Sequence, residues 1–242
     1  MSIDIYSIPL YYISFKKNTE LEKNLVKTGF NNINHFAAVD GRKLKPDKLI
    51  EDGKISIRAY NDLIFGRHEH SGLPSVGSVG CTLSHYSLWK KCIDDNLPYI
   101  TIAEDDLYID RKLSTNDEQN IKNAIQTKNG LFVSSIIDRN AENMFMGLHL
   151  YFLSNECCKQ LVKYTFPIDI QTDFYVSNLA RRKKINIEGY IIGKQKIHYS
   201  SIQDMCVKCY LPKKSGIYIL IGTLILFFSI FSMIRIVNCL KH

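Results

Sequence analysis

Three consecutive carboxylates, Glu104, Asp105 and Asp106, directly follow an apolar run from Tyr99 to Ala103. The run is short and rich in β-branched residues, and Pro98 precedes it, so it predicts a strand buried within a sheet. In an open α/β sheet, ligands gather beyond the carboxyl ends of the strands. Clustered carboxylate oxygens suit Mg²⁺ or Mn²⁺, and these ions suit a diphosphate. The pattern therefore indicates a divalent-metal site at a strand end, although a solvated acidic turn has the same composition.

The carboxylate strand must be held by a larger set of alternating strands and helices. Strands are expected over 5–15, 35–39, 131–137, 147–153 and 185–192, and helices over 20–28, 81–95, 155–164 and 172–181. In the first strand, regular pairing is expected only after Pro9, because proline has no N–H to donate to a neighbouring strand. Residues 43–78 predict a helix and a long irregular loop. The β-α-β order predicts an α/β fold with a mixed, mostly parallel, Rossmann-like sheet flanked by helices.

The composition of the chain fits one α/β domain and disfavours nucleic acid as a partner. Of the 242 residues, 45% are hydrophobic, which is enough for a core of that size. The formal net charge is +7, but the basic residues are scattered among acidic ones. No basic stretch alternates with aromatic residues, as grooves for single-stranded nucleic acids require.

Hydropathy changes sharply towards the carboxyl end of the chain. Residues 216–234 form an almost unbroken apolar run, and no charged residue lies between Lys214 and Arg235. Because about 20 such residues span a bilayer as a helix, a transmembrane helix is expected over 215–235, with a buried core helix as the alternative. A polar linker over 205–214 and a short tail over 236–242 would flank it. The chain begins without a signal-peptide pattern. We therefore expect a single-pass C-terminal anchor in a lipid bilayer, with the large domain in the cytosol.

Three blocks of sequence stand in order along the first half of the chain. They are Phe36-Ala-Ala-Val-Asp40-Gly41, Gly77-Ser-Val-Gly80-Cys81-Thr-Leu-Ser84-His85-Tyr-Ser-Leu-Trp89 and Ile102-Ala-Glu104-Asp105-Asp106-Leu107. Together they resemble glycosyltransferase family 25, the lipooligosaccharide biosynthesis and procollagen galactosyltransferase group. Pro167-Ile-Asp169 and Ser200-Ser201-Ile202 resemble weaker features of the family. The resemblance covers the chain from about residue 4 to residue 204, and its order and spacing make it specific.

This resemblance implies a GT-A-type domain over 1–204, a UDP-sugar donor and a divalent metal, commonly Mn²⁺. It implies transfer of a hexose, galactose or glucose, with inversion, to a hydroxyl of a glycan, glycolipid or protein acceptor. Two positions depart from the family pattern: Ser78 stands where an acidic residue is usual, and Lys16-Lys17-Asn18 replaces an arginine-containing stretch. An inactive binding or scaffold protein with the same sheet is therefore the alternative. A metal-dependent hydrolase could use the same carboxylates, but it does not explain the Gly-Cys-x-x-Ser-His block.

The resemblance and the carboxylate pattern together suggest roles for individual residues at the metal and donor sites. Asp106 is expected to bind the metal directly, and Glu104 to contact the metal, a metal-bound water or the ribose. His198 is a further candidate metal ligand. The expected donor-binding residues are Ser14, Asp40, Gly80, Ser84, His85, Glu104 and Asp105. Two of these have simpler interpretations, because His85 could be a structural histidine and Asp40-Gly41 is also a turn signal.

An inverting transfer needs a base that takes the proton from the acceptor hydroxyl. Asp169 and Asp173 are the candidates, and a helix would place them on one face because they lie four residues apart. Asp169 is preferred because it matches the Pro-x-Asp feature of the family. A helix N-cap would explain either aspartate equally well.

Overall fold

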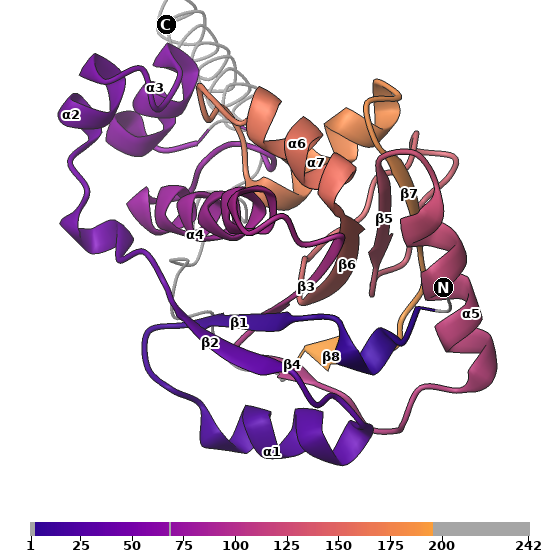
Figure 1. Ribbon diagram of the computed structural model, residues 1–242. Helices are drawn as coiled ribbons and strands as arrows, with labels where there is room; N and C mark the ends of the chain where they lie inside the picture. Colours follow the sequence, from indigo (N-terminus) through magenta and orange to yellow (C-terminus); the bar gives the residue numbers. More distant parts are fainter. Residues whose placement is uncertain (1–2, 68, 196–242) are drawn as a thin grey trace, which may run out of the picture. The chain divides into compact units, whose positions relative to one another are not determined.

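The computed structural model describes residues 3–67 and 69–195, which form a six-stranded mixed sheet and flanking helices (Figure 1). The strand order is β2-β1-β3-β6-β5-β7. The strands are β1 Leu10–Ser14, β2 Ile33–Ala37, β3 Tyr99–Glu104, β5 Gly130–Val133, β6 Leu150–Ser154 and β7 Asn186–Gly189. Strand β1 lies parallel to β2 and β3, and β5 lies parallel to β7. Strand β6 runs antiparallel to both of its neighbours, β3 and β5.

The helices cover both faces of this sheet (Figure 1). They are α1 Thr19–Thr28, α2 Pro46–Glu51, α3 Ile57–Phe65, α4 Val76–Asp94, α5 Thr115–Gln126, α6 Asn155–Tyr164 and α7 Thr172–Arg181, with 3-10 turns η1 Ile5–Ser7 and η2 Gly41–Lys43. Helices α4, α6 and α7 pack on one face, while α1 and α5 pack on the other. A short antiparallel pair, β4 Leu107–Tyr108 and β8 Lys194–Gln195, lies outside the main sheet.

Strand β6 shows how the sequence divides its side chains between two cores. Tyr151 and Leu153 belong to the core under α4, α6 and α7, whereas Leu150 and Phe152 belong to the core under α1 and α5. Successive side chains of a strand point to opposite faces, so an uninterrupted apolar strand indicates a sheet covered on both sides.

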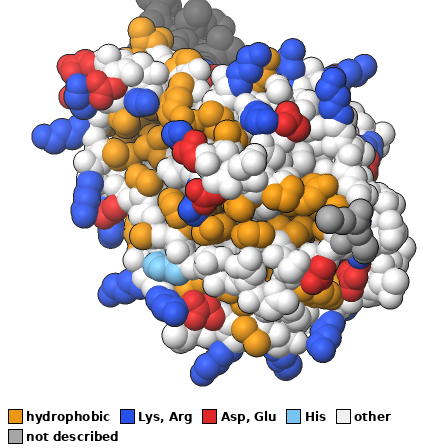
Figure 2. Space-filling model, viewed as in Figure 1, with side chains coloured by type: hydrophobic (Ala, Val, Ile, Leu, Met, Phe, Trp, Pro, Cys, Tyr) orange, Lys and Arg blue, Asp and Glu red, His pale blue; other side chains and the backbone are white. Residues whose placement is uncertain are grey.

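On the face seen in Figure 2, hydrophobic side chains occupy the middle, and charged side chains of both signs are dispersed around them.

Local signals in the sequence explain where several elements begin and end. Strand β1 starts at Leu10, directly after Pro9, as expected from the missing N–H of proline. Helix α1 starts after Asn18, whose side chain accepts a hydrogen bond from Leu21 N, and ends at Gly29 with φ +112°. Helices α6 and α7 have the predicted bounds.

Other elements differ from the sequence-based expectation. Residues 43–78 contain two short helices, α2 and α3, before α4 begins at Val76 rather than at residue 81. The earlier start of α4 follows from Ser75, whose hydroxyl caps the helix by accepting a hydrogen bond from Gly77 N. Helix α5 was not expected, because most of its side chains are polar and only one narrow stripe packs on the sheet.

The expectation of a membrane anchor needs correction. Across residues 3–67 and 69–195, none of the helices has both the length and the apolar character needed to cross a bilayer. The predicted transmembrane helix over 215–235, with its linker and tail, lies outside the described residues. The mixed α/β sheet fits a GT-A-type fold. A transmembrane helix, a membrane location and the bilayer as a partner were expected from hydropathy alone, and the structure does not support them.

Candidate metal and donor site

Two carboxylates and one imidazole converge where strand β3 ends. Glu104 is the last residue of β3, Asp106 lies in the turn that follows, and His149 directly precedes β6. The Nδ1 atom of His149 lies 3.1 Å from Oε2 of Glu104 and 3.4 Å from Oδ1 of Asp106. One ligand atom from each of the three residues lies within 4.8 Å of the other two. Two carboxylate oxygens and one imidazole nitrogen are donors that suit Mn²⁺, so the residues present fit the expected metal.

The antiparallel pairing of β3 with β6 brings His149 to this position. Ala103 pairs with Leu150, and Glu104 N donates to His149 O at 3.0 Å, so His149 lies opposite Glu104 across the two strands. Residues that are directly opposite in an antiparallel pair project from the same face of the sheet. Sequence analysis missed His149 because no local signal tells which strand will lie beside β3.

Charge dominates this cluster. Burial lowers the pKa of His149, but hydrogen bonds to Asp106 and Glu104 outweigh burial and raise that pKa to about 10. Burial has the opposite effect on Glu104 and raises its pKa, but hydrogen bonds from His149 and His85 outweigh burial and hold that pKa well below its usual range. The metal-free protein therefore keeps an imidazolium between two carboxylates, at a place built to attract positive charge.

Asp105, between Glu104 and Asp106, is affected by the charges of both neighbours. Burial, followed by the negative charges of Asp106 and Glu104, raises the pKa of Asp105 to about 6. Its backbone oxygen accepts a hydrogen bond of 3.2 Å from Nδ2 of Asn18, at the start of α1. This bond ties the acidic turn to the loop that follows β1.

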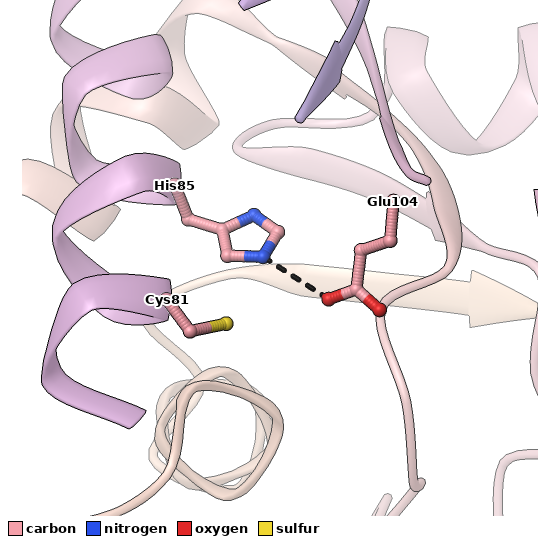
Figure 3. A group of neighbouring side chains, drawn as sticks. All are labelled: Cys81, His85 and Glu104. Atoms are coloured by element: carbon pink, nitrogen blue, oxygen red, sulfur yellow. Dashed lines mark hydrogen bonds and ion pairs between the residues drawn. The ribbon is translucent and has the colours of Figure 1, made fainter. Parts of the chain in front are cut away.

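Helix α4 supplies the second contact to Glu104 (Figure 3). Nε2 of His85 lies 3.3 Å from Oε1 of Glu104, and Nδ1 of His85 lies 2.8 Å from the hydroxyl of Tyr151. Cys81, one turn earlier on α4, also faces Glu104, and ligand atoms of Cys81, His85 and Glu104 lie within 4.8 Å of one another. Burial raises the pKa of the Cys81 thiol, so the thiol stays protonated. The structure thus contains a second group of possible ligands that shares Glu104 with the first.

The expected donor residues occupy the neighbouring edge of the sheet. Strands β2, β1 and β3 are parallel, so their carboxyl ends lie on the same side. Ser14 ends β1, is buried, and donates to Lys16 O at 2.6 Å. Asp40 follows β2 and caps η2, accepting bonds from the backbone and side chain of Arg42. Both residues are held by local contacts.

Gly80 and Ser84 fix helix α4 against the loop after β2. The Ser84 hydroxyl donates to Gly80 O at 2.8 Å and accepts from Val39 N at 2.9 Å. A Cβ atom at Gly80 would lie 2.6 Å from Val39 O, so only glycine allows this approach. Both residues therefore have packing roles, and the donor-binding role expected from the sequence stays a prediction.

The two candidate bases lie in different surroundings. Asp169 follows the bridge between Ile168 and Ile55, and its carboxylate accepts a hydrogen bond from Ser56 and pairs with Arg58 at 3.4 Å. Asp173 is in the first turn of α7, where its carboxylate accepts bonds from the backbone N–H of Gly147 at 3.1 Å and of Phe174 at 2.8 Å.

The charge of the carboxylate cluster reaches Asp173. The pKa of Asp173 is raised, mainly by burial and further by the charge of Glu104, although backbone hydrogen bonds partly offset the rise. The pKa of Cys81 responds to both Glu104 and Asp173. Asp173 therefore belongs to the surroundings of Glu104, whereas Asp169 is bound to the start of α3. The remaining candidate ligand, His198, lies outside the described residues.

The blocks noted in the sequence agree with a match to a known family. Residues 7–199 match the family described as "Glycosyltransferase family 25 (LPS biosynthesis protein)". The chain belongs to glycosyltransferase family 25. The resemblance expected from the three sequence blocks is therefore confirmed.

Several curated members of family 25 are similar to this chain. "Lipooligosaccharide biosynthesis protein lex-1" of Haemophilus influenzae is 25% identical over 147 residues, covering 51% of this chain and 48% of that protein. "Procollagen galactosyltransferase 2" of Homo sapiens is 28% identical over 102 residues, covering 40% of this chain and 15% of that protein. "Probable inactive glycosyltransferase 25 family member 3" of Rattus norvegicus is 37% identical over 70 residues, covering 29% of this chain and 11% of that protein. The matched region spans less than half of each of these relatives.

Proposed function

We propose that this chain is a metal-dependent glycosyltransferase that moves a hexose from a UDP-sugar to a hydroxyl group of a glycan, glycolipid or protein. The observation that carries the proposal is the convergence of Glu104, Asp106 and His149 at the end of β3. A site that already attracts a cation, beside the carboxyl ends of two further parallel strands, suits a nucleoside diphosphate. Membership of family 25 supports the same reaction class, and the name of the human relative favours galactose.

Each residue of the site has a distinct role in this proposal. Glu104, Asp106 and His149 would hold Mn²⁺, which would supply positive charge to balance the charge that develops on the departing UDP. His149 must lose its proton before Nδ1 can bind a metal, because an imidazolium has no free lone pair. The donor lies along the edge formed by the ends of β1, β2 and β3, where Ser14 and Asp40 are located.

Asp173 is the best candidate for the base. The acceptor oxygen attacks the anomeric carbon, the bond from that carbon to the UDP oxygen breaks, and the hydroxyl proton passes to a carboxylate. The raised pKa of Asp173 suits this task, since a base works best when its pKa is near the operating pH. Asp169 is the alternative base; its carboxylate accepts a hydrogen bond from Ser56 and pairs with the positively charged Arg58, which makes it a weaker proton acceptor.

An inactive protein that binds a nucleotide sugar is the second candidate function. The specific observation is Ser78, which stands where the family usually has an acidic residue. Its side chain is buried, and its hydroxyl has no hydrogen-bond partner among the residues described. The similarity to a probable inactive member of the family points the same way.

Release of UDP from a panel of UDP-sugars by the full chain, with Mn²⁺ or EDTA, separates these functions. We expect metal-dependent release from one sugar, lost in Asp106→Ala and retained in Asp94→Ala, whose carboxylate is exposed and pairs with Lys90. Binding of UDP and Mn²⁺ without release from any sugar, in the presence of a panel of acceptors, would favour the inactive protein. Unchanged Mn²⁺ binding by Asp106→Ala would refute the metal assignment.

A further inference from the structure

Three buried side chains form a hydrogen-bonded series that leads to Glu104. Nε1 of Trp89 lies 3.0 Å from the hydroxyl of Tyr151, and that hydroxyl lies 2.8 Å from Nδ1 of His85. Nε2 of His85 lies 3.3 Å from Oε1 of Glu104. Trp89 and Tyr151 are fully buried and His85 is 1% exposed, so solvent provides no alternative partner.

The direction of each bond follows from the donors available. The indole N–H of Trp89 can only donate, so the Tyr151 oxygen accepts this bond. The Tyr151 hydroxyl has one hydrogen, and Nδ1 of His85 is the only acceptor for it in the described part of the chain. Leaving a buried hydroxyl hydrogen without an acceptor costs free energy. Nδ1 of His85 must therefore be unprotonated, and the ring proton of the neutral imidazole sits on Nε2.

This tautomer decides what His85 can do to Glu104. An Nε2–H group donates to Oε1 of Glu104, while Nδ1 of His149 lies 3.1 Å from Oε2, the other carboxylate oxygen. Both oxygens of Glu104 are thus held in place. The same tautomer leaves no lone pair on Nε2, so the group formed by Cys81, His85 and Glu104 cannot bind a metal despite its short distances.

From this geometry we infer that Tyr151 is a positioning residue for the metal site. By donating to His85, Tyr151 makes His85 a hydrogen-bond donor towards Glu104 and keeps His85 from acting as a ligand itself. The effect resembles the outer contacts that orient metal ligands in other proteins. The role in metal binding rests on the proposed function, whereas the tautomer of His85 does not depend on it.

The tautomer can be measured directly on the metal-free full chain. In a neutral imidazole, the unprotonated nitrogen has a ¹⁵N chemical shift far from that of the protonated nitrogen. The His85 signals are assigned by their loss in His85→Gln. We expect the unprotonated signal at Nδ1 and the protonated one at Nε2. The reverse pattern, or protonation of both nitrogens, would overturn the inference whether or not the protein binds a metal.

Metal binding by variants tests the consequence for Glu104. Tyr151→Phe removes the hydroxyl and keeps the ring, and should weaken Mn²⁺ binding about 10- to 100-fold in calorimetry. Tyr190→Phe is the matched control, because it removes a hydroxyl that donates to Asp117 of α5, and Tyr190 packs on the other face of the sheet. A folded Tyr151→Phe protein with wild-type Mn²⁺ affinity would overturn the role of Tyr151.

Variants of His85 provide a second test in case Tyr151→Phe does not fold. His85→Gln retains an N–H donor on a side chain of sufficient reach, whereas His85→Leu retains none. We expect His85→Gln to bind Mn²⁺ at least tenfold more tightly than His85→Leu. Equal affinities would overturn the inference. If the wild-type chain binds no Mn²⁺, the proposed metal site fails, and the ¹⁵N measurement alone decides the tautomer.

Discussion

Replacing His149 with glutamine removes the cation that neutralises Glu104 and Asp106 in the metal-free protein. Folding raises the pKa of His149 from its ordinary value of 6.5 to about 10. Each pH unit of such a change corresponds to about 1.4 kcal/mol, so the contacts of the imidazolium contribute at most about 5 kcal/mol. The His149 side chain is 19% exposed, and screening by water reduces this to about 2–5 kcal/mol.

The sign of the pH dependence follows from the direction of the pKa change. Because the pKa is higher in the folded state, the stabilisation is complete below pH 6.5 and is lost as the pH rises towards 10. His149→Gln should therefore lower the free energy of unfolding by about 2–5 kcal/mol at pH 6.5, and by less than about 1 kcal/mol at pH 9.5.

Urea unfolding of the metal-free full chain at these two pH values measures the effect. Urea is preferable to guanidinium chloride because it does not screen charges. His35→Gln is the control, since it removes an imidazole that contacts a backbone carbonyl of Ser14 instead of a carboxylate. If His149→Gln lowers the free energy of unfolding equally at both pH values, His149 does not act as a cation and the electrostatic description of the site is wrong.

Three further predictions concern single residues. The pKa of Asp105 is raised to about 6, so folding disfavours its ionised form. Asp105→Asn should therefore raise the free energy of unfolding of the metal-free protein by about 1–3 kcal/mol at pH 8 and change it little at pH 4. Urea unfolding measures both values, and a lower free energy of unfolding at pH 8 would contradict the prediction. Gly80→Ala places a Cβ atom 2.6 Å from Val39 O and should lower the free energy of unfolding by about 1–3 kcal/mol in the same assay. An unchanged value would mean that α4 can shift away from the loop after β2 without loss of stability. Asp173→Asn should lower kcat for UDP-sugar transfer about 10²- to 10⁴-fold while Mn²⁺ affinity stays within a few-fold; a larger loss from Asp169→Asn would reverse the ranking of the two bases.

The sequence predicted the parts of the fold that rest on local signals. The apolar run before Glu104 is β3, and the amphipathic segments over 155–164 and 172–181 are α6 and α7. Periodicity and caps act within a few residues, so they are visible without knowing what the segment packs on. Helix α5 was not predicted, because most of its residues are polar and only a few of them are buried.

The site was predictable only in part, because its members come from distant segments. The three carboxylates could be recognised because they are consecutive in the sequence. His149 could not, because it lies 45 residues after Glu104 and is brought beside it only by the pairing of β3 with β6. The proposed preference for Asp173 over Asp169 also rests on a long-range contact, the hydrogen bond from Ser56 to Asp169, which the sequence does not reveal. Family motifs pointed to Gly80 and Ser84, and the packing of α4 against the loop after β2 gives them a structural role that the sequence alone does not reveal.

The pairing of β3 with β6 makes the core and the candidate metal site depend on a single alignment. Ile102 pairs with Tyr151, and His149 lies opposite Glu104, so one register fixes both the positioning residue and the candidate ligand. A slip of one residue would turn Tyr151 and His149 to the face covered by α1 and α5. Residues 134–149 connect β5 to β6. Insertions or deletions there are therefore compatible with function only when they leave the pairing of β3 with β6 unchanged.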